Sequence, residues 1–149
     1  MLRAAILLLV WSLLSALSVA QNAFIYTPPP RSTFAPGESF VVDIDRPDTL
    51  TNSRDVSVAI GLLSCVGRAP PGTCDGIDSA WQMGDILYAG PYTPLVPPDG
   101  ANAYENFTVT VPADFQPGPA VLAVAHFTLV GALFWPSLEV LNETVFIEN

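Results

Sequence analysis

The most informative stretch of this 149-residue sequence is Ala-Val-Leu-Ala-Val-Ala-His-Phe-Thr-Leu-Val, which spans residues 120–130. Successive side chains of an extended strand point to opposite faces of a sheet. One face of this stretch carries Ala120, Leu122, Val124 and His126, and the other carries Val121, Ala123, Ala125 and Phe127. Because both faces are almost wholly apolar, we expect a central strand whose outer face is covered by a loop or by a partner.

Working outward from this strand, six other segments alternate or are rich in strand-forming residues, and turn formers separate them. They are residues 24–26, 40–45, 56–62, 81–88, 107–111 and 138–147. No stretch sustains a helical period, since the 15 Pro and 10 Gly interrupt the chain. The pattern predicts an all-β fold, a single antiparallel β-sandwich of about seven strands that is immunoglobulin-like. A small β-barrel is the alternative architecture.

The first twenty residues have the pattern of a secretory signal peptide. Arg3 precedes an apolar run from Ala4 to Leu17, and small residues follow at Ser18 and Ala20. We expect residues 1–20 to be removed by cleavage between Ala20 and Gln21, which leaves residues 21–149 as one domain. A membrane anchor is the alternative, but the run is short for a span of ~30 Å of hydrocarbon. The sequence therefore predicts a secreted protein without stable membrane insertion.

Two cysteines and two sequons agree with secretion. Cys65 and Cys74 are the only cysteines, and the turn formers between them favour a disulfide. A redox or metal pair is the alternative, although the spacing is not C-x-x-C and no His lies nearby. Asn106 and Asn142 begin Asn-x-Thr sequons and are predicted N-glycosylation sites. If Asn142 faces solvent, Glu143 faces the interior, an unfavourable position for a carboxylate unless a bulge or an edge relieves it.

The charge balance argues against nucleic acid as a partner. The chain contains no Lys, and residues 21–149 carry four Arg against 14 acidic residues, a net charge of −10. Binding to phosphates requires a basic patch, which this composition does not supply.

Few residues suggest chemistry. The only histidine, His126, shares a strand face with apolar residues, so we expect it to fill or flank the core. Asp43, Asp45 and Asp48 could supply oxygens to Ca²⁺, but a solvated strand face is the favoured interpretation. We expect no catalytic residue, no metal and no cofactor, and therefore no enzyme.

The unusual feature is an apolar segment after the central strand. Residues 130–136 include Leu133, Phe134 and Trp135, and exposed apolar clusters of this kind mark interaction sites. A predicted partner surface therefore consists of Val121, Ala123, Phe127, Leu133, Phe134 and Trp135. The alternative is that these side chains plug one end of the sandwich.

Several runs resemble the fungal necrosis-inducing secreted effector family. They are residues 58–62, 84–92, 106–112, 118–122, 129–132 and 142–145, and the resemblance covers about residues 56–147. It implies a secreted effector of plant-associated fungi that binds immune receptor-associated kinases and suppresses pattern-triggered immunity without catalysis. Such a protein would act in the host apoplast or after translocation into the host cell.

A cell-wall or carbohydrate-binding module is the alternative function. Trp81, Tyr88, Tyr92 and Trp135 could stack on sugar rings if they lay on one exposed sheet face.

Overall fold

The computed structural model describes residues 23–48 and 52–149, and this part of the chain is built from eight strands without a helix. The strands are β1 (Phe24–Thr27), β2 (Thr33–Phe34), β3 (Ser39–Arg46), β4 (Ser53–Ser64), β5 (Asp85–Pro91), β6 (Ala103–Thr110), β7 (Gly118–Val130) and β8 (Trp135–Ile147). Accordingly, no described helix is long and apolar enough to cross a membrane. The predicted signal peptide and its cleavage site lie outside the described residues.

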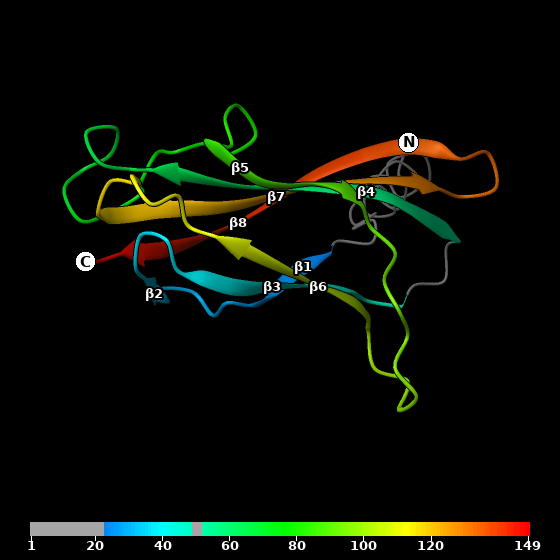
Figure 1. Ribbon diagram of the computed structural model, residues 1–149. Coiled ribbons are helices and arrows are strands. Elements are labelled where there is room, and N and C mark those ends of the chain that lie inside the picture. The colour runs from blue at the N-terminus through cyan, green and yellow to red at the C-terminus, as the bar shows by residue number, and fades with distance from the viewer. Residues whose placement is uncertain (1–22, 49–51) are drawn as a thin grey trace, which may run out of the picture.

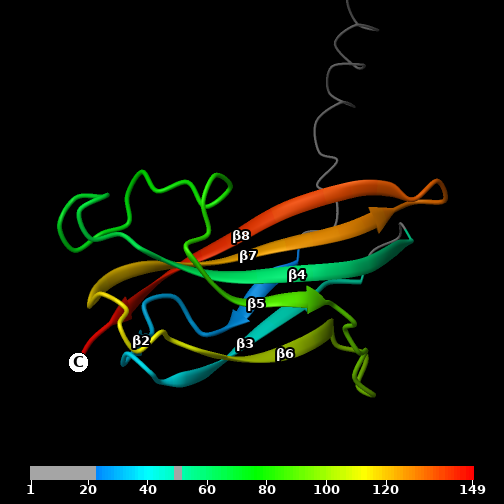
Figure 2. The ribbon, with the colours of Figure 1, turned by 45° about the horizontal axis from the view of Figure 1, so that its top comes forward.

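The strands form two open sheets that face each other (Figures 1 and 2). The smaller sheet has the order β1-β3-β6 and the larger sheet has the order β2-β8-β7-β4-β5. All paired strands are antiparallel except β2 and β8, which run parallel. The prediction of an all-β fold is confirmed, and neither sheet closes into the barrel considered as the alternative.

The core lies between the two sheets. Val42 and Ile44 of β3 face Ile60 of β4 and Leu122 and Val124 of β7, and all five side chains are fully buried. Removing a large aliphatic side chain of this kind from water stabilises the fold by about 1.5–3 kcal/mol. The face of β7 predicted to point inward therefore does so, and β7 lies between β4 and β8 as a central strand.

The outer face of β7 is covered in part by the chain itself. The long loop between β4 and β5 folds back over the larger sheet (Figure 1) and forms a second small core. This core consists of Leu63, Cys65, Val121 and Ala123, packed against Ala69, Cys74, Ile77 and Met83. The loop includes Trp81–Gly84, so the strand predicted over residues 81–88 begins four residues later, at Asp85, and ends at Pro91.

Gly61 lets this loop approach the sheet closely. A Cβ atom at this position would overlap the Met83 carbonyl oxygen and lie 2.8 Å from the Met83 Cβ. We predict that Gly61→Ala lowers the free energy of unfolding by about 1–3 kcal/mol, the usual cost of overpacking. Urea denaturation measures the effect. Ala59→Ser, on the same face of β4, is the control and should shift the value by less than about 0.5 kcal/mol.

Candidate functional site

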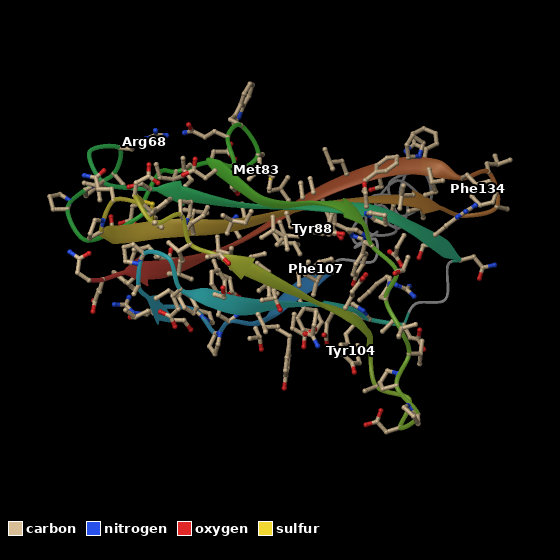
Figure 3. The ribbon with its side chains drawn as sticks, viewed as in Figure 1. Arg68, Met83, Tyr88, Tyr104, Phe107 and Phe134 are labelled. Carbon is tan, nitrogen blue, oxygen red and sulfur yellow. A yellow bond between two sulfur atoms is a disulfide. The ribbon has the colours of Figure 1, made fainter. Side chains whose placement is uncertain are left out.

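The β7–β8 hairpin presents large apolar side chains to solvent. Val130 pairs with Trp135, and residues 131–134 form the turn. The exposed fractions are 94% for Leu133, 57% for Phe134 and 74% for Trp135. We call Leu133, Phe134 and Trp135 the hairpin tip; the hairpin lies at one end of the molecule in both ribbon views, and Figure 3 labels Phe134 there.

The backbone of the hairpin tip is held in place. The Gly131 N–H donates to the Asn52 carbonyl at 2.8 Å, and the Phe134 N–H donates to the Gly131 carbonyl at 3.2 Å. Phe134 has φ of 54°, a left-handed conformation that is unfavourable for an aromatic residue and costs on the order of 1 kcal/mol. An exposed phenylalanine in this conformation adds little to folding, which points to a role outside the fold.

Two further apolar side chains lie near the hairpin tip on the outer face of the larger sheet, the face opposite to that of Trp135 in the alternation of β8. Phe127 of β7 pairs with Leu138 of β8, and Leu138 is 67% exposed. Phe127 is half-buried. The apolar surface is defined here as the hairpin tip together with Phe127 and Leu138, and it is the main candidate for an interaction site in this chain.

The structure corrects part of the predicted partner surface. Val121 and Ala123 are 4% and 0% exposed because the loop after β4 packs over them. They cannot contact a partner in this structure, whereas Phe127 and the hairpin tip remain accessible. Leu138 was missed, since its position opposite Phe127 depends on the length of the turn, which the sequence pattern does not define.

A buried cluster of charges lies near the hairpin on the inner face of the larger sheet. His126 is 1% exposed; its Nδ1 lies 2.8 Å from Glu139 Oε1 and its Nε2 lies 3.0 Å from Asp55 Oδ1. Arg46 forms a 2.9 Å ion pair with Asp55. The Tyr92 ring packs edge-on against the imidazole, with 5.2 Å between the two ring centroids. The prediction of a histidine in the core is confirmed, but its acidic partners come from other strands and were missed.

The cluster keeps His126 protonated. Burial lowers the pKa of an imidazole, but the hydrogen bonds to Asp55 and Glu139 and the charges of these carboxylates outweigh it and raise the pKa of His126 to about 9. Both ring nitrogens are therefore donors in a neutral solution, and each already has a carboxylate acceptor. The charged hydrogen bonds hold His126, Asp55 and Glu139 together as an ion cluster, and neither ring nitrogen of His126 is free to act as a general base.

Cys65 and Cys74 form the predicted disulfide. The bond ties the start of the covering loop to its middle, within the small core that contains Val121 and Ala123. We predict that Cys65→Ser combined with Cys74→Ser lowers the free energy of unfolding by about 2–3 kcal/mol, as the entropy of a short closed loop suggests. Because the loop then covers the sheet less firmly, binding of a hydrophobic dye should rise. Unchanged urea and dye measurements would contradict this account of the loop.

The remaining predicted positions are spread over the molecule. Asn106 and Asn142 are exposed on β6 and β8. Glu143 is half-buried, its Oε2 atom is buried and has no hydrogen-bond partner among the described residues, and burial raises the pKa of its carboxyl group. Among residues 23–48 and 52–149, no group of three His, Cys, Asp or Glu side chains could hold a metal ion.

The four aromatic residues of the carbohydrate-binding alternative do not share one exposed face. Tyr92 is 1% exposed and donates from its hydroxyl to the Ile44 carbonyl at 2.9 Å, while Tyr88 packs on Phe107 at the core. Trp81 and Trp135 are exposed, but one lies in the loop after β4 and the other in the hairpin tip. The arrangement expected of a sugar-stacking platform is therefore not present in these residues.

Comparison with known proteins gives the family. A family model described as the Nis1 family matches residues 20–146. A similar protein is "Necrosis-inducing secreted protein 1" of Colletotrichum higginsianum (strain IMI 349063), which is 28% identical over 130 residues, covering 86% of this chain and 81% of that protein. The resemblance predicted from the residues is confirmed, as is secretion. The chain thus belongs to the Nis1 family.

Proposed function

We propose that this protein is a secreted fungal effector that binds a host protein and thereby suppresses plant pattern-triggered immunity without catalysis. The observation that carries the proposal is the apolar surface, with Leu133, Trp135 and Leu138 each at least 67% exposed. Side chains of this size stabilise complexes strongly when a partner buries them, whereas in the free protein they gain nothing from exposure to water.

The proposed architecture is an immunoglobulin-like sandwich formed by residues 21–149. The strand order supports it, because β1 and β2 divide the N-terminal segment between the two sheets. In addition, β3 lies beside β6, and β4, β7 and β8 are neighbours in the other sheet. Such a scaffold presents the β7–β8 turn at one end, where sandwiches commonly carry binding loops.

The lack of catalysis is supported by the buried ion cluster. His126 is the only histidine, and both of its ring nitrogens are engaged by Glu139 and Asp55. The family resemblance likewise implies binding, with immune receptor-associated kinases as the class of host partner. Action in the apoplast or inside the host cell is compatible with the same surface.

Processing of the secreted protein is part of the proposal. Cleavage before Gln21 would yield the mature N-terminus, and the exposed positions of Asn106 and Asn142 would admit glycans. Mass spectrometry of the protein after expression in and secretion from a fungus would test both the cleavage and the glycosylation. An N-terminus at Gln21 and glycan mass on the two Asn-containing peptides are expected, and a retained leader or unmodified peptides would contradict the respective statement.

A pull-down tests the partner class. The secreted protein, immobilised through a C-terminal tag, is incubated with purified plant receptor-like and cytoplasmic immune kinases, and in parallel with insoluble cell-wall polysaccharide. We expect retention of at least one kinase and none on polysaccharide. Retention on polysaccharide alone would favour the carbohydrate-binding module, and no kinase binding together with unaltered immune output in planta would refute the proposal.

A further inference from the structure

One edge of β8 is left open by the way the N-terminal segment is divided between the sheets. On one side β8 pairs with β7 along its whole length, but on the other side β2 pairs only at Phe146 and Ile147. The Arg31 N–H extends this contact to the Thr144 carbonyl at 2.7 Å. Residues 28–30 are prolines, which have no N–H to continue the pairing, and the chain before them belongs to β1 in the other sheet. In the described part of the chain, residues 136–142 therefore have no strand hydrogen-bonded to them on this edge. Ala23–Ile25, at the start of β1, lie next to Leu141–Glu143, and the Ala23 N–H donates to Glu139 Oε1 at 3.0 Å.

The direction of the backbone groups follows from the contacts with β2. The Thr144 carbonyl accepts from the Arg31 N–H, and the Phe146 N–H donates to the Ser32 carbonyl at 2.9 Å. The backbone N–H and C=O groups of even-numbered residues of β8 therefore point toward this edge. The register with β7 is unbroken from Trp135 to Ile147, so the same alternation of backbone direction holds over the whole of β8. Leu138, Val140 and Asn142 thus each direct one N–H and one C=O to the open edge. Pro136 fits the same pattern, since a proline is tolerated where its nitrogen faces away from the ladder.

Apart from the glycan proposed at Asn142, the edge lacks most of the features that usually protect an exposed strand. Charged side chains, above all Lys, commonly prevent strand addition, but this chain has no Lys. The one charged side chain within residues 136–142 is Glu139, which is directed inward to His126. Leu138 is 67% exposed beside the edge and belongs to the apolar surface. The open backbone groups and the exposed Leu138 side chain therefore lie side by side along this edge.

We propose that residues 136–142 of β8 accept an extended segment of the partner protein, which adds to the larger sheet as a further strand in line with β2. The inference rests on the proposed function and specifies how the partner is held. Backbone hydrogen bonds to Leu138, Val140 and Asn142 provide the affinity, and alternate apolar side chains of the segment pack on Leu138 and Val140. The existing parallel pairing of β2 shows that this edge of β8 already accepts a strand from this chain.

Residue-resolved amide exchange with a defined peptide tests the proposal. The probe is Ac-Ser-Thr-Val-Thr-Val-Thr-Ser-amide at millimolar concentration, and the control peptide has Pro in place of both Val. We expect the probe to slow exchange at Leu138, Val140 and Asn142 at least tenfold. The N–H groups of Glu139 and Leu141 point to β7 and should exchange slowly with or without the peptide. The control peptide should leave all exchange rates unchanged.

Two variants make the result specific. Val140→Pro removes one edge N–H, and Leu138→Lys introduces a protective charge if the proline variant does not fold; either should weaken peptide binding at least tenfold. Protection of another strand in place of β8, no protection at saturating peptide, or equal protection by the control peptide would overturn the proposal. So would light scattering that shows a dimer whose β8 edge amides are already slow, because a second copy would then occupy the edge. If the amide-exchange test fails but the kinase pull-down succeeds, the strand-addition proposal is refuted and the proposed function is intact. If the peptide protects the β8 amides but no kinase is retained, only the host-binding proposal is refuted.

Discussion

Replacement of His126 by Leu is expected to lower the free energy of unfolding by about 3–5 kcal/mol, the largest stability change that we predict for this protein. The imidazolium lies between Asp55 and Glu139, at 3.0 and 2.8 Å. Its removal leaves Glu139 without its cationic partner and leaves Asp55 paired with Arg46 alone. Breaking a buried pair by deleting one member typically costs this much, since the remaining charge is uncompensated. Urea denaturation of the wild-type protein and the variant measures the change.

The control is a double-mutant cycle with Glu139→Gln, since Glu139 is the carboxylate that loses its only cationic partner, whereas Asp55 keeps Arg46. If the cost arises from uncompensated charge, the second substitution should recover part of the loss, and the coupling should exceed about 1 kcal/mol. Additive effects of the two substitutions would contradict the ion-cluster interpretation and would assign the loss to packing alone.

The same cluster predicts how stability depends on pH. The pKa of His126 is raised from 6.5 to about 9 in the folded protein. Its contribution, roughly 3 kcal/mol, is therefore fully present below about pH 6.5 and is lost as the pH rises toward 9. His126→Leu should lack this decline, so the difference between wild type and variant should shrink between pH 6.5 and 9. A constant difference over this interval would argue against a protonated His126.

Replacement of Leu133 and Trp135 together by Ser is expected to weaken binding to the host partner at least 100-fold. Truncating one central apolar residue of an interface often costs 2 kcal/mol or more, and the two residues are 94% and 74% exposed in the free protein. Because they make few contacts within the fold, the melting temperature should change by less than about 4 °C. Titration calorimetry and thermal denaturation measure the two effects.

A matched control is Trp81→Ser, which removes a tryptophan that is 87% exposed in the loop after β4. We expect it to leave host binding within about twofold of wild type, since it lies outside the apolar surface. If Trp81→Ser weakened binding as much as the hairpin variant, the contact would lie on the covering loop and the assignment of the surface would be wrong.

Much of the fold could be predicted because strands of a two-layer protein carry a period of two. The alternation located β3, β4, β6, β7 and β8, including the inward position of Glu143, although β4 and β6 begin three and four residues before the predicted bounds. β2 was not predicted, since two residues are too few to show a period. The start of β5 was placed too early because Trp81 and Met83 are apolar residues two positions apart, as on one face of a strand. In the structure both lie in the loop, where Met83 packs in the small core and Trp81 is exposed, and local patterning cannot distinguish this from a strand.

The candidate site was predicted only in part. The hairpin tip stood out as three large apolar residues between turn formers, and the structure leaves them exposed. The burial of Val121 and Ala123 could not be predicted, because it depends on where a 20-residue loop returns to the sheet. The ion cluster was missed for a similar reason: Asp55, His126 and Glu139 lie on three strands, and only the register of β4, β7 and β8 brings them together.

Affinity purification from infected plant tissue tests most directly the claim that this protein works by binding a host protein through its apolar surface. The tagged wild-type protein, the Leu133→Ser/Trp135→Ser variant and the Trp81→Ser control are expressed at equal levels in the infecting fungus. The account predicts that the wild type and the control enrich the same plant protein and that the hairpin variant does not. Enrichment of no plant protein by the wild type, or equal enrichment by the hairpin variant, would contradict it.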